Sequence, residues 1–110
     1  MNIDVSEATP FRVIRLAGDV DLHSSPQARQ AILDELKRGT PLLVDLSAVS
    51  YMDSSGVASL VEGYQTARKQ GIEFGLAAPA TAALNVLKLA RLDKVFPIHA
   101  SVAERLARGD

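Results

Sequence analysis

The fold is decided by residues 44–64, VDLSAVSYMDSSGVASLVEGY, which begin as an apolar strand and end as an apolar helix. In the helical part, apolar side chains recur at the spacing of one helix face, at Val57, Leu60, Val61 and Tyr64. Two serines and a glycine, preceded by an aspartate, stand where the strand passes into the helix. The stretch therefore predicts a strand–helix unit whose junction is unusually polar.

The same alternation of strand and helix continues on both sides of this unit. Strands are expected over residues 3–6, 11–17, 41–46, 72–77 and 94–98, and helices over residues 26–38, 54–70, 79–92 and from 102 onward. The first two strands, joined through a turn that contains Pro10, should pair antiparallel, and the later ones should run parallel through right-handed crossovers. The sequence predicts an α/β fold: one domain, residues 1–110, with a mixed sheet of about five strands packed against four helices.

Capping residues predict the helix ends, and the periodicity of apolar residues predicts the core positions. Ser25 is expected as N-cap with Pro26 in the first helical position, and Gly39 and Gly71 as helix stops. A capping box should open the terminal helix, with Ser101 and Glu104 as its members. The residues expected to be buried together are Leu43, Leu46, Val57, Leu60 and Val61, with Leu84, Leu87 and Ala90 pointing inward from the third helix.

Composition excludes several function classes. The chain has a net charge of −1, with scattered Lys and Arg, and so lacks the basic surface of a nucleic-acid-binding protein. It has no cysteine, and its two histidines, His23 and His99, are far apart, which gives no pattern for a metal site or a cofactor. No apolar run reaches the roughly 20 residues of a membrane span, and the polar start is unlike a secretory signal. We expect a cytoplasmic protein that does not insert into a membrane.

The junction at residues 53–56 allows an ordinary explanation and a functional one. With Asp53 as N-cap, Met52 and Val57 occupy the two positions of a hydrophobic staple, and the serines fall in the first turn. Capping alone does not explain Gly56, which costs roughly 0.5–1 kcal/mol relative to alanine inside a helix. A glycine here leaves room for the close approach of another group, and a helix start favours an anion such as a phosphate on a serine.

Enzymatic alternatives are less consistent with the sequence. A nucleophile elbow requires G-x-S-x-G, and its first glycine is missing; a catalytic base would have to be His23, which lies in a loop, or His99. The phosphate-binding motif G-x-x-x-x-G-K-[ST] is absent. A response-regulator receiver would use Asp19, Asp21 and Lys94, but the capped helix after Asp53 suits serine chemistry better. We therefore do not expect an enzyme.

Residues 44–56 and the helical stripe after them resemble the STAS domain, specifically the anti-anti-sigma factors of bacterial partner-switching systems. The turn Gly18-Asp19-Val20-Asp21 is similar to that family's Gly-Glu-Leu-Asp turn. The resemblance implies that Ser54 is phosphorylated by an anti-sigma factor that is also a serine kinase with a histidine-kinase-like ATPase fold. It further implies that a PP2C-type phosphatase removes the phosphate, and that the unphosphorylated protein sequesters the anti-sigma factor.

Other branches of the same family serve in lipid-transport complexes or as tails of anion transporters. A constitutive STAS binding module without a phospho-switch is therefore the alternative. In either case the second and third strands should be neighbours, which brings residues 18–23 and 53–56 to one edge of the sheet. The expected partner-binding residues are Asp19, Asp21, His23, Asp53, Ser54, Ser55 and Gly56. Of the serine pair, we expect an accessible Ser54 hydroxyl and a more enclosed Ser55 that is hydrogen-bonded to backbone.

Overall fold

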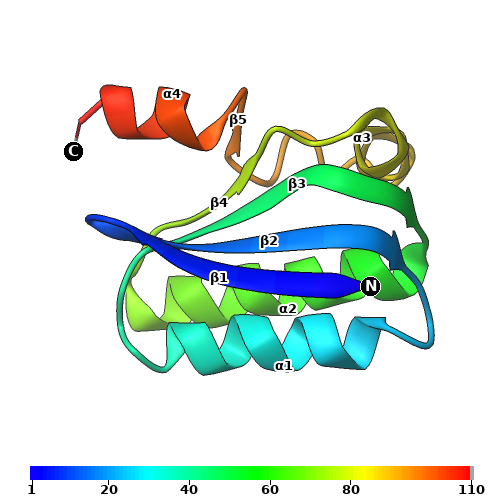
Figure 1. Cartoon of the computed structure of the whole chain (residues 1–110), viewed down its shortest axis with the longest axis horizontal. Coiled ribbons are helices and arrows are strands. Elements are labelled where there is room, and N and C mark those ends of the chain that lie inside the picture. Colours follow the sequence, from blue (N-terminus) through cyan, green and yellow to red (C-terminus); the bar gives the residue numbers. More distant parts are fainter. Residues whose placement is uncertain (110) are drawn as a thin grey trace.

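The computed structural model describes residues 1–109 as one five-stranded sheet with helices on both of its faces (Figure 1). The strands are β1 (Asn2–Ala8), β2 (Phe11–Val20), β3 (Leu42–Met52), β4 (Phe74–Ala77) and β5 (Ile98–His99), in the spatial order β1-β2-β3-β4-β5. The helices are α1 (Ser25–Leu36), α2 (Ser54–Gln70), α3 (Thr81–Leu89) and α4 (Val102–Ala107). β1 pairs antiparallel with β2 and all other pairs are parallel, as the sequence predicts.

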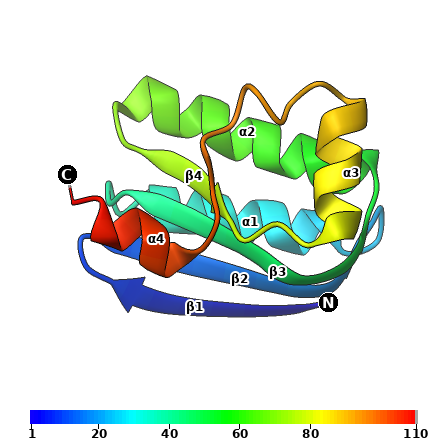
Figure 2. The same ribbon diagram turned by 90° about the horizontal axis from the view of Figure 1, so that it is seen from above.

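The main core lies between the sheet and the helices α1 and α2, which run side by side under one face (Figures 1 and 2). Side chains of alternate β3 residues point into this core, at Leu42, Val44 and Leu46. Val57 and Leu60 of α2 meet them there, and Val61 is half-buried at the edge of the cluster. The predicted helix stripe is therefore confirmed.

A smaller apolar cluster lies on the opposite face of the sheet, under α4. It contains Phe11, Val13 and Leu43, covered by Val102 and Leu106 of α4. The prediction that Leu43 is buried together with Leu46 is wrong, because odd and even positions of β3 face opposite sides of the sheet. Burial of both faces explains why residues 42–44 are apolar without alternation.

β2 and β3 are longer than the sequence pattern predicts, because β3 bulges twice. The register shifts between Arg15 and Ala17 and again between Gly18 and Asp19. At each shift β3 contains one residue more than the paired segment of β2. After Leu46 the buried positions of β3 are Val49 and Met52, three residues apart instead of two. Because of this spacing, the second half of β3 lacks the period-2 alternation by which a strand is predicted from sequence.

Several predicted boundaries are also wrong near the helix ends. The N-cap of α1 is Ser24, and Ser25 is already helical and buried, because the turn before it continues directly into the helix. α3 ends at Leu89, so Ala90 is exposed and Ala83 takes the inward position beside Leu87. The last strand is Ile98–His99, and Lys94 lies in the preceding turn. Of the predicted capping box of α4, the Ser101 half is confirmed, since Ser101 Oγ accepts a hydrogen bond from the N–H of Glu104, whereas the Glu104 carboxylate accepts from the N–H of Ala100.

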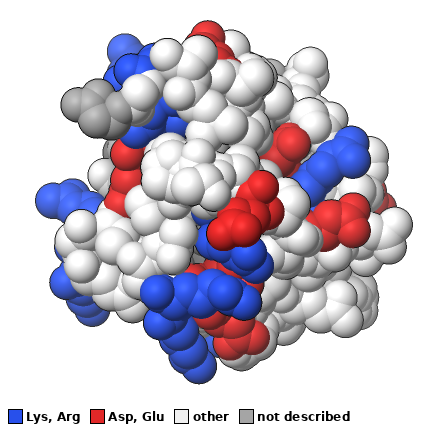
Figure 3. Space-filling model, turned by 60° about the vertical axis from the view of Figure 1, so that its left-hand side comes forward, with Lys and Arg blue, Asp and Glu red and all other residues white. Residues whose placement is uncertain are grey.

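At the end of the sheet that carries the β1–β2 turn, charges of both signs are intermixed (Figure 3). Arg12 Nε lies 2.8 Å from Glu35 Oε1, which joins β2 to α1. The buried Arg105 of α4 donates to both carboxylate oxygens of Glu73 and stacks over the ring of Phe11, 4.8 Å from its centre. Charged side chains at this end therefore link α1 and α4 to the rest of the fold.

Candidate functional site

Two loops meet at the carboxyl edge of β2 and β3. Val20, the last residue of β2, is paired with Met52, the last residue of β3, and the N–H of Asp53 donates to the carbonyl oxygen of Val20 over 3.2 Å. Both Val20 and Met52 are buried. The expectation that residues 18–23 and 53–56 share one edge is confirmed.

The loop between β2 and α1 is held in place by its own side chains. Asp21 Oδ1 accepts hydrogen bonds from the N–H groups of His23 and Ser24, each over 3.0 Å. These bonds, that of Ser24 first, hold the pKa of the half-buried Asp21 carboxyl below its usual value. Ser24 Oγ donates to the carbonyl oxygen of Asp19. Gly18, at a φ of +92°, supplies the positive-φ backbone next to the second register shift between β2 and β3.

Asp19 links the same loop to β3. Its Oδ1 accepts a hydrogen bond from Ser50 Oγ over 3.0 Å, and its neighbour in the β3 strand is Tyr51. Asp19 is exposed, whereas Asp21 is half-buried. Of the two carboxylates expected to contact a partner, Asp19 is thus the more accessible, and Asp21 also maintains the loop.

Asp53 caps α2, as the sequence predicts. Its Oδ1 accepts from the N–H of Ser55 over 2.9 Å and from the N–H of Gly56 over 3.3 Å. Ser54 follows in the first turn and is exposed, whereas Ser55 is half-buried. The difference in exposure agrees with the expectation for the pair. The hydrogen bonds that the structure gives to Ser55 run through its backbone, not through its hydroxyl.

Gly56 does not leave room for an approaching group. A Cβ at this position would lie 2.8 Å from the carbonyl oxygen of Val20 and 2.9 Å from Met52 Cγ. Gly56 is buried, and the space beside it is filled by the chain's own β2 and β3. The prediction that Gly56 leaves room for another group is therefore wrong. The missing side chain instead allows α2 to start against the end of the sheet.

A groove between α1 and α2 begins next to the serine pair, with a volume of about 310 Å³. Across it, Arg29 donates to both carboxylate oxygens of Glu62, each over 2.7 Å. Ser59, buried at its floor, donates to the backbone carbonyls of Ser25 and Ser55. Sequence reasoning missed these residues, although Ser55, Ser59 and Glu62 repeat at helical spacing as a polar stripe beside the apolar one.

We expect the cap to be a main local support of the site. Replacing Asp53 by Ala leaves the N–H groups of Ser55 and Gly56 without their acceptor, and should lower the free energy of unfolding by about 1 kcal/mol. Asp53→Asn should retain most of it, because an amide oxygen also accepts. Urea denaturation measures both values; an Asp53→Ala variant as stable as the parent would contradict the role given to this bond.

The two histidines lie in different parts of the molecule. His23 is exposed in the β2–α1 loop, next to the site. His99 is buried in β5, where its Nε2 has no hydrogen-bond partner among the described residues and packs against Gly75 of β4. Burial, and then the charges of Arg108 and Arg105, hold the pKa of His99 below its usual value, while Glu73 and Glu104 act in the opposite direction. His99 belongs to the packing of β5 on β4, and residues 1–109 hold no metal-binding cluster.

Burial of His99 predicts a pH-dependent stability. Because its pKa is lower in the folded state than the ordinary 6.5, the unfolded chain binds more protons as the pH falls below that value. Stability should therefore decrease from pH 7 toward pH 5, with a slope of at most about 1.4 kcal/mol per pH unit. Urea titrations at several pH values measure it. A flat profile would show that His99 is not held neutral by burial.

The chain is similar to known proteins in both sequence and structure. The sequence model of the STAS domain family matches residues 2–105 of the chain. The chain is 32% identical over 71 residues to an anti-sigma-B factor antagonist of Bacillus subtilis, which covers 64% of the chain and 65% of that relative, just under two thirds of its length. It is 27% identical over 109 residues to the anti-sigma-F factor antagonist RsfB of Mycobacterium tuberculosis, covering 96% of the chain and 87% of the relative.

The solved structures agree with the sequence relatives. An anti-sigma factor antagonist from Mycobacterium paratuberculosis superposes with a TM-score of 0.88 at 29% identity, over 97% of this chain and 92% of that one. Within residues 1–109, no helix combines the length and the apolar character required to cross a bilayer. The residues that match the STAS domain, 2–105, include all five strands and the junction that carries Ser54.

Proposed function

The chain belongs to the STAS domain family, and on this basis we propose that it is an anti-sigma factor antagonist controlled by phosphorylation of Ser54. Unphosphorylated, it binds an anti-sigma factor and keeps that factor from its sigma factor. Its proposed contact surface consists of Asp19, Asp21, His23, Asp53, Ser54 and Ser55; Gly56, also predicted as a contact residue, is buried and is left out of it. The relatives named above are anti-sigma factor antagonists by name, and a binding role, without catalysis, is what we propose here.

The observation that carries the proposal is the exposed Ser54 on a rigidly held helix start. Asp53 fixes the first turn through two hydrogen bonds, and Gly56 is packed against Val20 directly beneath it. The Ser54 side chain is thus presented to solvent on a fixed backbone. A hydroxyl in such a position is accessible to a kinase, and a modification there changes the surface without disturbing the core.

The electrostatic effect of a phosphate on Ser54 follows from its neighbours. Phosphate adds a charge of about −1.5 to −2. The helix start would favour an anion, but the N–H groups of Ser55 and Gly56 already donate to Asp53. The phosphate therefore meets Asp53 as a like charge with little compensation, and a partner that offers Arg or Lys to the unmodified surface must desolvate a dianion in the modified one.

The partners follow from the same proposal. We propose that the anti-sigma factor is itself the serine kinase, with a histidine-kinase-like ATPase fold, and that a PP2C-type phosphatase reverses the modification. Both reactions use ATP or water from the cytoplasm, which is where we place the protein. The alternative, a constitutive STAS binding module, has the same fold and surface but predicts no effect of modification at Ser54.

Site-resolved phosphorylation tests the proposal. The protein is incubated with the candidate anti-sigma kinase and ATP, and the modified residue is mapped by mass spectrometry. We expect one phosphate, on Ser54, and none on Ser54→Ala, while Ser55→Ala should still be modified. Labelling of Ser55 in preference to Ser54, or no labelling while the two proteins form a stable complex, would support the constitutive module instead.

A further inference from the structure

Two exposed patches lie on the same end face of the molecule. Each combines apolar side chains with charged ones, and the two patches are opposite in charge. Among residues 1–109, four of the five large apolar side chains that are exposed belong to these patches. The first, the acidic patch, consists of Asp19, Asp21, Leu22 and Tyr51. The second, the basic patch, consists of Lys88, Leu89, Arg91, Lys94 and Val95, from the end of α3 and the turn after it.

The apolar members of both patches are unusually open. Leu22 is 70% exposed and Tyr51 51% in the acidic patch; Leu89 is 86% exposed and Val95 48% in the basic one. The three cations of the basic patch make no ion pair with any described residue, and Asp93 is the one carboxylate among them in the sequence. Apolar side chains surrounded by charge of one sign are typical of protein contact surfaces.

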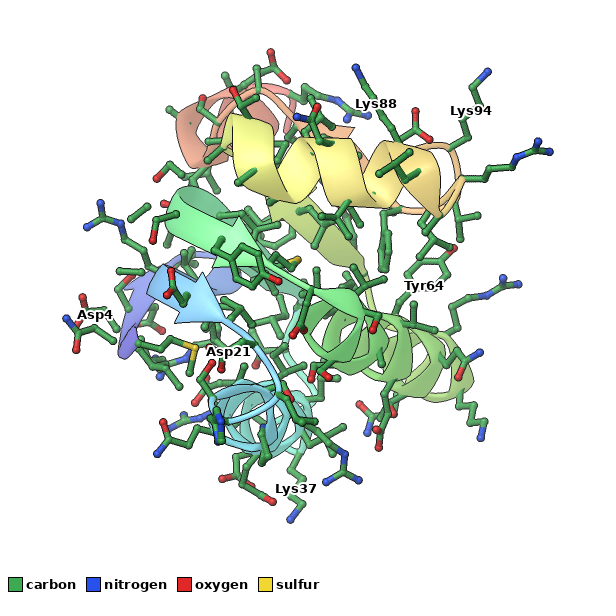
Figure 4. All side chains as sticks on the ribbon, turned by 90° about the vertical axis from the view of Figure 1, so that its right-hand side faces the viewer. Asp4, Asp21, Lys37, Tyr64, Lys88 and Lys94 are labelled. Atoms are coloured by element: carbon green, nitrogen blue, oxygen red, sulfur yellow. The ribbon has the colours of Figure 1, made fainter. Side chains whose placement is uncertain are left out.

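The positions of the patches suit a symmetric contact. Figure 4 looks onto this end face and shows Asp21 on one side of it and Lys88 and Lys94 on the other, with the start of α2 between them. In a dimer with a two-fold axis, each patch of one copy meets the opposite patch of its partner, so the same contact forms twice and the assembly closes. Patches on opposite ends of the molecule would instead give open chains.

We propose that this end face is a self-association surface, on which a second copy of this chain docks with its acidic patch on the basic patch. Leu22 and Tyr51 then pack against Leu89 and Val95 of the partner copy, and Asp19 and Asp21 face its cations. Charge complementarity within one sequence selects a second copy as the occupant. An acidic segment of another protein would be complementary to the basic patch alone.

The size of the face sets the strength of the dimer. The molecule measures 25 × 23 Å across its long axis, so a contact over this end buries at most roughly 600 Å² of each partner, less than the roughly 800 Å² of a standard interface. We therefore expect a weak dimer, with a dissociation constant on the order of 100 µM at low salt, that weakens further as salt screens the charges. Because the start of α2 lies between the patches, the dimer covers Ser54. That the dimer thereby hinders phosphorylation rests on the proposed function, whereas the existence of the dimer does not.

Sedimentation equilibrium of the protein alone tests the proposal, over concentrations from about 10 µM to about 1 mM. The parent should be a salt-sensitive monomer–dimer system. Lys88→Glu/Lys94→Glu should be monomeric, and Asp19→Lys should dimerise more weakly than the parent. An equimolar mixture of the two should associate more than either variant alone, because one contact of that heterodimer joins an intact acidic patch to an intact basic patch. Lys37→Glu/Lys69→Glu, which makes the same charge change outside both patches, should dimerise like the parent.

Several results would overturn the proposal. These are a parent that stays monomeric throughout, a dimer that survives Lys88→Glu/Lys94→Glu, a mixture that associates no more than either variant alone, and assemblies that keep growing with concentration. Circular dichroism melts of each variant show whether the fold is intact, and Leu89→Ser gives a second variant with little risk to folding, since Leu89 is almost fully exposed. It should weaken the dimer about tenfold. Because no kinase is present, failure here leaves the proposed function untouched.

Discussion

Protein phosphorylated on Ser54 should bind the anti-sigma factor at least about 100-fold more weakly than the unmodified protein, which corresponds to about 2.7 kcal/mol. Two effects combine in this loss. The dianion must be desolvated within an interface, and it stands beside Asp53, whose carboxylate already occupies the N–H groups that would compensate it. Isothermal titration of both forms against the candidate partner, at equal salt, measures the ratio.

Two substitutions at Ser54 separate charge from shape. Ser54→Ala should bind like the unmodified protein and resist the switch, with almost unchanged stability, because Asp53 remains as N-cap. Ser54→Asp should weaken binding about tenfold, since a single carboxylate imitates a dianion poorly. Asp19→Ala should weaken it through the contact surface and leave phosphorylation possible. Equal affinities of the parent, Ser54→Asp and the phosphorylated protein would refute the switch and leave a constitutive module.

Gly56→Ala should destabilise the fold by about 2 kcal/mol, and Gly56→Val by more. Alanine is the better helix former by about 1 kcal/mol, but its Cβ would stand 2.8 Å from a backbone oxygen of Val20, which cannot move without displacing β2. Overpacking of this kind typically costs about 1–3 kcal/mol and can cost more. For a domain of this size the melting temperature should fall by about 10 °C.

The control for Gly56 lies two residues away on the other side of the same turn. Ser54→Ala introduces alanine at an exposed position, and its melting temperature should stay within about 2 °C of the parent. If Gly56→Ala were as stable as Ser54→Ala, the close approach of α2 to the end of β2 would not matter for stability. Partner binding, measured on the same variants, should fall with Gly56→Ala because Ser54 and Asp53 move with the helix start.

The sequence predicts those features of this fold that depend on local pattern. The α2 stripe from Val57 onward has a period that only a helix gives, and the Asp53 cap and the Gly71 stop follow from the chemistry of helix ends. The pairing of β1 with β2 follows from the length of their connection. The family resemblance rests on the same junction, and the match to the STAS domain confirms it.

What the sequence does not predict depends on contacts between distant residues. The bulges of β3 arise from its register with β2, so the strand appears to end at Leu46 although it runs to Met52. Leu43 lies on the face opposite to the predicted one, which the sequence does not reveal because both faces of β3 are apolar there. The ion pair between Arg29 and Glu62 joins residues 33 positions apart, which no local pattern indicates.

The buried residues at the foot of each loop have a consequence for the thermodynamics of association. Val20 and Met52 anchor the two loops in the core, and Asp21 and Asp53 tie down the backbone beyond them. Little of this surface has to be ordered when a partner arrives, so the entropic penalty of binding falls mainly on the partner. Recognition by this edge of the sheet should resemble the fit of two rigid bodies, with fast association and an affinity that a single added charge changes through the rate of dissociation.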